Sequence, residues 1–338
     1  MITECSQVPR VPLRISSYEN LQMAVYVLGC PCQGEMIVTV LLDGDEVKYS
    51  ILTDCYLRSI RHANVFARWC NKIGVSHFDT IIFTHPDVDH CMGVDYLVRL
   101  MDPSYSSLLF IHSQMYAVVK ISEDQILRPF REIWSGYKRN GTLRLQSKTQ
   151  IRSKIMLEIE FNPMLQESSL MQLVQLAPDD IYLADHNLYR KNGSSHNDLS
   201  LVYSIYYNNK NYLYCADMPG DGVKYIDENY LYNVRFVKIP HHGSPDCIAL
   251  PAMLYGGTST GITSVTTIYH KLADEYKLPQ DQILKLYKNK GSVYCTGPHV
   301  HSAPSKLYKY GGVRLSWSLF DDSMAAEWDG NAYEYVNN

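Results

Sequence analysis

Apolar segments of strand length, separated by turns, begin near residue 23 and predict the layout of the first third of the chain. An Asp-Gly-Asp turn at 43–45 joins two of these segments. Apolar residues then recur at helical spacing over 57–73. We predict strands at Met23–Leu28, Met36–Leu42, Lys48–Thr53 and Phe78–Phe83. Strands that alternate with a helix indicate a layered α/β fold.

The pattern of apolar and polar positions is weaker between residues 100 and 195. It predicts helices near Glu123–Tyr137 and Pro163–Gln175 and a strand at Lys154–Phe161. We interpret 100–195 as an insertion or lid region within one domain that spans 20–320.

Strand patterns return after this region. Leu199–Tyr206 and Asn211–Cys215 flank the turn at 208–210 and predict a hairpin. We also expect strands at Val234–Ile239, Ser292–Thr296 and Val313–Ser318, a helix at Ile283–Lys288, and fraying of the polar final residues.

Composition and charge narrow the class of protein. The 338 residues are 46% hydrophobic and 20% charged, which is typical of a globular protein with a buried core and excludes a disordered chain or a fibre. Lysine and arginine total 31 and aspartate and glutamate 35, so the net charge is −4. A chain of this charge has no global basic field for nucleic acid, and any affinity for phosphate must be local.

Cysteine usage bears on the compartment. Nine cysteines are an odd number, and the first 30 residues interleave charged and apolar positions rather than forming a signal peptide. We therefore expect reduced thiols, a cytoplasmic protein and no membrane segment. Cys91, Cys215 and Cys295 are interpreted as small buried hydrophobes.

The segment 84–90, Thr-His-Pro-Asp-Val-Asp-His, follows the apolar run that ends at Phe83 and carries two imidazoles and two carboxylates. Burying so many ionisable groups at a strand end costs several kcal/mol each unless something compensates them. Divalent cations are the usual compensation, and this ligand mixture suits zinc, manganese or iron. A solvated charged turn is the alternative interpretation.

The HxDxDH pattern of this segment resembles the HxHxDH signature of the metallo-β-lactamase fold superfamily, which also follows a strand. Asp87 stands where that signature has its second histidine. The variant is similar to the metallohydrolase domain of ComEC-type bacterial DNA-uptake proteins and their stand-alone relatives. The resemblance implies an αββα sandwich with an inserted region.

Later segments follow in the order expected for that subfamily. The segment 238–244, Lys-Ile-Pro-His-His-Gly-Ser, resembles its PHHGS motif, and 213–217 resembles the strand that ends in a metal-bridging aspartate. Weaker likenesses occur at 32–37, 52–55 and 196–202.

The resemblance implies two divalent metal ions, zinc or manganese, in a dinuclear site. One would be held by His85, Asp87 and His196, the other by Asp89, His90 and His242, with Asp217 between them. His242 is preferred to His241 because it precedes the glycine, but the choice stays open at this point. Asp54 is expected to support a ligand rather than to be one.

Substrate contacts are less defined. Relatives carry a histidine-rich segment near 277–280, which here reads Lys-Leu-Pro-Gln, and His299 and His301 could replace it. Ser244 of the PHHGS segment is also a candidate contact. Asp89 would orient the attacking water, and His241 or a water would protonate the leaving oxygen.

The resemblance implies a metal-dependent hydrolase of phosphodiester bonds, with a nuclease as the leading hypothesis and nucleic acid or a small phosphodiester as substrate. One alternative is a hydrolase of cyclic nucleotides, lactones or thioesters. Another is a catalytically silent metal- or nucleotide-binding sensor or scaffold that engages a protein partner through 100–195. Metal analysis and a panel of substrates would separate these.

Overall fold

Two β-sheets form the centre of the computed structural model, which describes residues 7–29, 34–113, 128–146, 153–163, 167–185, 196–256, 261–270, 277–297 and 311–336. The first sheet has eight strands among the described residues, and the predicted meander at its centre is confirmed as β2, β3 and β4. Its order is β18 (Met324–Gly330), β17 (Gly311–Ser318), β2 (Leu21–Gly29), β3 (Glu35–Asp43), β4 (Glu46–Thr53), β5 (Thr80–Phe83), β6 (Leu108–His112) and β7 (Leu143–Gln146).

The second sheet has nine described strands. Its order is β1 (Arg10–Ile15), β8 (Lys154–Pro163), β9 (Ser169–Ala177), β10 (Val202–Tyr207), β11 (Lys210–Tyr214), β12 (Val234–Lys238), β13 (Thr263–Thr266), β16 (Val293–Cys295) and β19 (Tyr333–Glu334). The predicted hairpin is confirmed as β10 and β11, and both Asn208 and Asn209 of its turn have positive φ.

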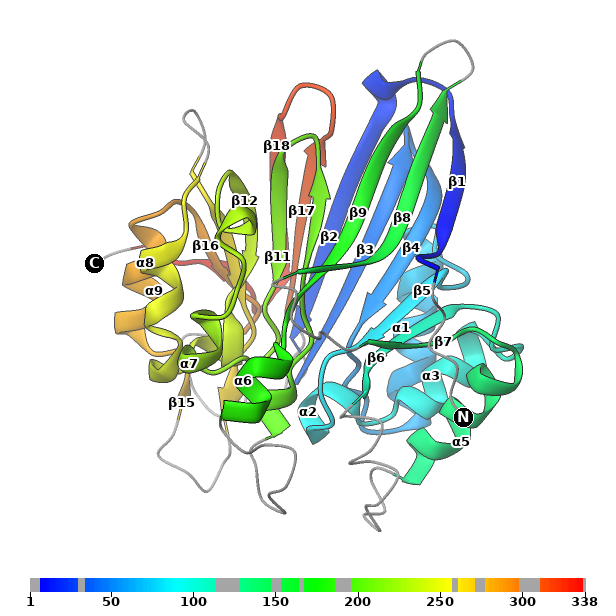
Figure 1. The fold of residues 1–338 in the computed structure, drawn as a ribbon, viewed down its shortest axis with the longest axis horizontal. Coiled ribbons are helices and arrows are strands. Elements are labelled where there is room, and N and C mark those ends of the chain that lie inside the picture. The colour runs from blue at the N-terminus through cyan, green and yellow to red at the C-terminus, as the bar shows by residue number, and fades with distance from the viewer. Residues whose placement is uncertain are drawn as a thin grey trace.

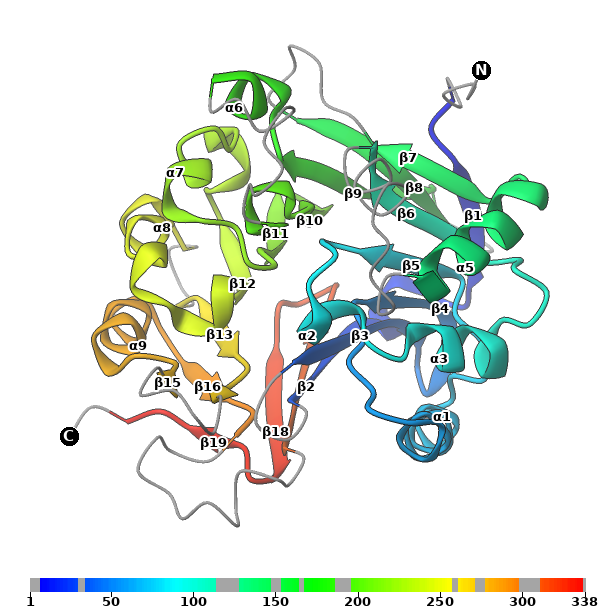
Figure 2. The same ribbon diagram turned by 90° about the horizontal axis from the view of Figure 1, so that it is seen from below.

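Helices cover the outer faces of the two sheets (Figures 1 and 2). The eight-stranded sheet is covered by α1 (Ile60–Lys72), α3 (Val94–Met101) and α5 (Arg128–Arg139). Beside the nine-stranded sheet lie α6 (Asp180–Asp185), α7 (Gly220–Val223), α8 (Ala249–Met253) and α9 (Asp281–Lys288). Short α2 (Val88–Cys91) lies near the middle of the molecule (Figure 2).

Three large hydrophobic cores, among the residues that the structure describes, separate these layers. One lies between the two sheets and contains Phe110, Phe161 and Trp317, and each outer core lies between a sheet and its helices. This layering confirms the αββα sandwich predicted from the sequence.

Parallel pairing determines where the sandwich can place a site. Strands β4 to β7 are parallel in one sheet, and β11, β12, β13 and β16 are parallel in the other. Ligands of open α/β sheets bind beyond the carboxyl ends of such strands. The loops after β5, β11, β12 and β13 are therefore the positions to inspect.

The predicted helix at 163–175 is wrong. Most of this segment is β9, which pairs with β8 on one side and β10 on the other. Leucine, methionine and glutamine favour a helix locally, but Met171 and Leu173 are buried in the core between the sheets. Packing on both faces and pairing at both edges override the local preference.

The C-terminal expectation is also wrong in part. Residues 324–330 form the edge strand β18, and 333–334 form β19, rather than a frayed tail. The described part of 100–195 supplies β6 and β7 to one sheet and β8 and β9 to the other. Its role as a lid or partner-binding region, and the 20–320 domain, stay predictions.

Cysteines within the described residues agree with the sequence interpretation. Cys91, Cys215 and Cys295 are buried free thiols, as are Cys55, Cys70 and Cys247. Among the described residues, we find no helix with the length and apolar character required to cross a membrane.

We expect Leu173→Ala to lower the free energy of unfolding by about 2 to 5 kcal/mol, because it creates a cavity in the core between the sheets. Urea denaturation followed by circular dichroism measures this. Ile181→Ala, at a residue 50% exposed, is the control and should cost less than about 1 kcal/mol. Equal losses in the two variants would contradict the placement of β9.

Candidate metal centre

The predicted ligands lie where strands of both sheets end. His85 lies two residues beyond β5, and α2 then carries Asp89 and His90. From the other sheet, Asp217 follows β11, and His242 lies in a 3-10 turn, Pro240–Gly243, after β12. Neither sheet alone contains the whole set.

The second predicted ligand group converges around Asp217. His90 Nε2 lies 3.2 Å from Asp217 Oδ1, and His242 Nε2 lies 3.6 Å from Asp217 Oδ2. His242 Nε2 is also 3.1 Å from Asp89 Oδ2. All four side chains are buried, and the structure therefore brings the predicted trio and the predicted bridging aspartate together.

The first predicted group lies beside it. His85 Nε2 is 3.8 Å from Asp87 Oδ2 and 4.0 Å from Asp217 Oδ2, and its ring centroid is 4.1 Å from that of His90. His196 Nδ1 lies 2.6 Å from Asp87 Oδ1. Asp217 therefore lies between the two groups. The assignment of individual ligands stays a prediction.

Asp54 lies behind His90 and determines how its imidazole is oriented. Its Oδ2 accepts from His90 Nδ1 at 2.8 Å and from the Thr84 hydroxyl at 2.6 Å, and its Oδ1 accepts from the Thr84 backbone N–H. Because Thr84 donates its proton to Asp54, its oxygen accepts from His85 Nδ1 at 3.0 Å. Both histidines thus hold their Nδ1 protons away from the cluster.

His242 is oriented by a network that sequence reasoning missed. Its Nδ1 lies 2.7 Å from Thr267 Oγ1, and the Thr267 hydroxyl donates to Glu35 Oε2 at 2.9 Å. The same carboxylate oxygen is 2.6 Å from Lys238 Nζ, and both charged residues are fully buried. Thr267 therefore accepts from His242 Nδ1, which leaves the His242 Nε2 lone pair facing the carboxylates.

The signal for this network was present but weak. Glu35 and Lys238 both belong to segments quoted for the resemblance. Each is a charged residue at the end of a strand, and the other positions of these strands are buried except Asp43. A charge in such a position is costly unless paired, but nothing in the sequence says that these two strands face each other.

The hydrogen bonds create an arrangement in which imidazole nitrogens and carboxylate oxygens share either a proton or a metal ion. The Nε2 atoms of His85 and His90 and Oδ1 of Asp217 are buried and have no hydrogen-bond partner among the described residues. Each Nδ1 proton is already directed elsewhere, so an Nε2 atom without a proton would face carboxylate oxygens as a second acceptor, and a proton or a metal ion must lie between them. Burial would lower the pKa of His90, but the charges of Asp217, Glu35 and Asp54 raise it well above its ordinary value.

The charge balance agrees with this conclusion. Asp54, Asp87, Asp89, Asp217 and Glu35 surround the site, and Lys238 is the one lysine in this network of described residues. If all the imidazoles are neutral, these groups carry a net charge of −4, which the charge of two divalent cations, +4, would balance. Histidine nitrogen and carboxylate oxygen are ordinary ligands of zinc and related ions. The donor set therefore fits the predicted metal ions.

Backbone conformation around the site is unusual. Asp54, Ala216, His241 and His242 all have φ between 45° and 55°, in the left-handed region that side chains other than glycine rarely adopt. Such strain persists only where surrounding contacts enforce it, and it concentrates at functional sites. These turns place consecutive side chains in directions that a regular strand end cannot provide.

The two histidines of the PHHGS segment point to different partners. His242 is buried among the carboxylates, whereas His241 Nδ1 is 2.9 Å from Asp246 Oδ2 and its Nε2 is 3.3 Å from Asn197 Nδ2. Burial would lower the pKa of His241, but its hydrogen bond with Asp246 and the charge of Asp217 raise it. The geometry favours His242 as the ligand and leaves His241 at the edge of the site.

Other sequence predictions have mixed outcomes. Ser244 is buried and its hydroxyl hydrogen-bonds to Asp246, so its predicted contact with substrate stays a prediction. His299 and His301 lie outside the described residues. Sequence reasoning also missed Asp246, because no motif connects it to His241.

No family model matches this chain, and no curated protein matches it. Two solved structures are similar to it in part. One is a new diphosphatase from the PhnP family, at 13% identity over 78% of this chain and 91% of that chain, with a TM-score of 0.38. The other is a candidate metallo-beta-lactamase from Thermotoga maritima, at 17% identity over 48% of this chain and 77% of that chain, with a TM-score of 0.25. Because both TM-scores are below 0.5, our description of the fold rests on the layers and strand order given above.

We expect Lys238→Met to lower the free energy of unfolding by about 3 to 5 kcal/mol, because it leaves Glu35 buried beside other carboxylates without a cation. Urea denaturation in the presence of a chelator measures the effect on the protein itself. The double variant Glu35→Gln/Lys238→Met should recover at least half of the loss. A double variant as unstable as the single one would show that the unpaired charge of Glu35 does not cause the loss of stability.

Proposed function

We propose that this protein is a metal-dependent phosphodiesterase of the nuclease type with a dinuclear centre. The observation that carries this proposal is that the Nε2 atoms of His85, His90 and His242 are all directed at the oxygens of Asp217 and Asp89. Imidazoles and carboxylates in this relation form a binding site for cations rather than a set of ion pairs. The order of the HxDxDH and PHHGS segments supports a phosphodiester as the substrate.

The chemistry that the ions would supply is that of two-metal hydrolases. A bound pair of divalent cations lowers the pKa of water and neutralises charge on the attacked group and the leaving oxygen. His85, Asp87 and His196 would hold one ion, and Asp89, His90 and His242 the other, with Asp217 contributing to both.

The protein's own side chains then orient the reactants. The Asp89 carboxylate accepts a hydrogen bond from the attacking water and fixes its direction. His241 lies at the edge of the site and donates a proton from Nε2 to the leaving oxygen. Asp246 accepts from His241 Nδ1, which directs Nε2 toward the centre. Asn197 Nδ2 lies 3.3 Å from the same Nε2 and donates to it when Nε2 carries no proton, so the Asn197 amide must turn its oxygen toward the ring when Nε2 is protonated.

Two other functions would give different results. Hydrolysis of lactones or thioesters would use the same ions. A thioester expels a weakly basic thiolate, which has little need of a proton donor, whereas a lactone or a phosphodiester expels an alkoxide, which needs one. A metal- or nucleotide-binding sensor would bind the ions without turnover. The decisive experiment is therefore to assay the purified protein with zinc or manganese on a chromogenic phosphodiester, single- and double-stranded DNA, RNA, cyclic nucleotides and a lactone.

We expect Asp217→Asn to remove most bound metal and to lower the rate of phosphodiester hydrolysis by about 100-fold or more, because this carboxylate faces both ligand groups. Elemental analysis and a bis(p-nitrophenyl) phosphate assay measure the two effects. His77→Ala is the control. His77 precedes β5 and hydrogen-bonds to the Met101 carbonyl, so this variant should change neither the metal content nor the rate. Full metal content and activity in Asp217→Asn would refute the proposed centre.

We expect Asp246→Asn to lower kcat about 10- to 100-fold for a nucleotide phenyl ester but less than about 3-fold for the p-nitrophenyl ester, with KM little changed in both. The phenyl ester has the more basic leaving oxygen and needs the proton from His241 more. Steady-state kinetics on the two esters makes this comparison. His241→Ala and the double variant should show the same pattern, and equal losses on both esters would contradict the role of this pair.

A further inference from the structure

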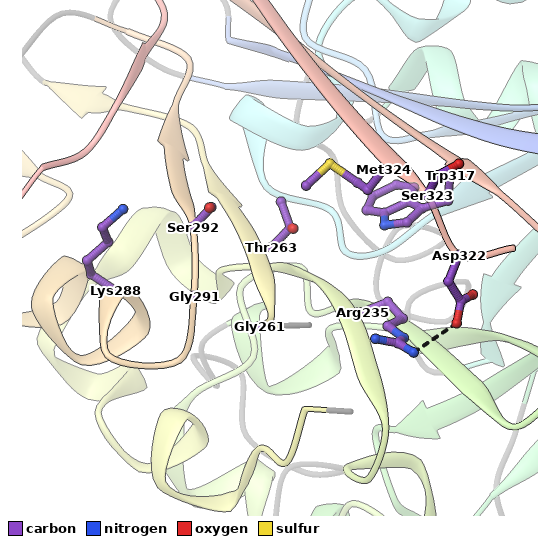
Figure 3. A pocket seen from close by; sticks show the side chains of 10 residues that line it. All are labelled: Arg235, Gly261, Thr263, Lys288, Gly291, Ser292, Trp317, Asp322, Ser323 and Met324. Carbon is purple, nitrogen blue, oxygen red and sulfur yellow. Dashed lines mark hydrogen bonds and ion pairs between the residues drawn. The ribbon is translucent and has the colours of Figure 1, made fainter. Parts of the chain in front are cut away.

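A cavity lies at the end of β12 opposite the candidate metal centre. It has a volume of about 470 Å³, which is within the range of small-molecule sites. Its walls come from β12, β13, α9 and the hairpin of β17 and β18 (Figure 3). It lies at the start of β12, β13 and β16, whereas the metal centre lies beyond the ends of β5, β11 and β12.

A β-bulge places a buried arginine in the wall of this cavity. Between β11 and β12, Asn211 pairs with Val234 and the next residue, Tyr212, pairs with Phe236, so Arg235 has no partner in the register. Bulges of this kind redirect a side chain out of the alternating pattern of the strand. Arg235 is 91% buried and lines the cavity, where it points toward Asp322 (Figure 3).

The charge of Arg235 is only partly compensated. Its Nη2 donates to Asp322 Oδ2 at 3.0 Å, but the same carboxylate also pairs with Lys210. One aspartate thus serves two buried cations. Nε and Nη1 of Arg235 have no hydrogen-bond partner among the described residues. An uncompensated buried charge is costly, and an anion in the cavity would remove that cost.

The remaining walls fit a phosphate with an organic body. Thr263 and Ser292 add hydroxyl groups that can donate to several oxygens. Lys288 lines the cavity from α9, on the side away from Arg235 in Figure 3, and its Nζ is 3.3 Å from Glu334 Oε1, so it adds positive charge to the wall rather than a free donor. Guanidinium and hydroxyl donors around a dianion favour phosphate over a single carboxylate. Trp317 and Met324 form an apolar wall of the cavity. An aromatic or apolar ligand body can pack there.

We propose that this cavity is a binding site for a small phosphate monoester, with its phosphate next to Arg235 and its body against Met324 and Trp317. The site is separate from the metal centre and does not depend on the proposed activity. Adenosine 5′-monophosphate is a suitable probe because it combines a phosphate with an aromatic base. Adenosine lacks the phosphate and tests the need for it, and succinate tests whether a carboxylate dianion can replace it.

Isothermal titration of the full-length protein with the nucleotide tests the proposal. We expect saturable binding that weakens about 10-fold or more in Arg235→Met, since a charged hydrogen-bond partner is lost. Lys288→Met should weaken binding about 3-fold or more, and this variant replaces Arg235→Met in the test if Arg235→Met does not fold. Lys285→Met is the matched control on the exposed side of α9 and should bind like the wild type.

His242→Ala separates the two sites. Nucleotide binding that persists in His242→Ala but is lost in Arg235→Met supports the cavity. Four results would overturn the proposal: no binding by the wild type at millimolar nucleotide, equal affinity in Arg235→Met, adenosine or succinate binding as tightly as the nucleotide, or loss of binding in His242→Ala.

Discussion

The structure depends on one electrostatic constraint, which is the concentration of carboxylates at the point where the two sheets meet. Asp54, Asp89, Asp217 and Glu35 are all buried there, and the imidazoles between them already use their Nδ1 protons elsewhere. A protein interior tolerates such a cluster only if cations neutralise it. Lys238 supplies one positive charge from within the chain. The remaining positive charge can come from protons on the imidazoles or from metal ions, and the fold brings together the side chains that would hold such ions.

This constraint connects the site to the stability of the sandwich. The Glu35–Lys238 pair joins β3 of one sheet to β12 of the other, and Thr267 extends it to His242. The same residues therefore hold the sheets together and orient a ligand. Because the candidate ligands come from both sheets, ions held by them would bind the folded sandwich better than the unfolded chain, and their binding would add to the free energy of unfolding.

The part of the site that could be predicted is the part that is contiguous or ordered in sequence. Residues 85–90 present their chemistry within a single segment, and the strands before it and before Asp217 have clear apolar patterns. The pairing of Glu35 with Lys238 could not be predicted, because it depends on how two distant strands meet. The strand β9 was missed for a similar reason, since its helix-favouring residues are overruled by burial and by pairing with β8 and β10. Asp246 could not be predicted either, because no sequence motif links it to His241, the residue whose imidazole it contacts.

The two ends of β12 show what distinguishes a structural charge from a binding site. Lys238 and Arg235 are both buried cations on this one strand. Lys238 has Glu35 within 2.6 Å and donates to the Ile239 carbonyl, so its charge and hydrogen bonds are satisfied by the protein. Arg235 shares its single carboxylate with Lys210 and lies beside open volume. A buried cation whose charge and donors are satisfied by the protein stabilises the fold. One that is partly unpaired beside a cavity can still bind an anion there. The two ends of β12 therefore have different roles.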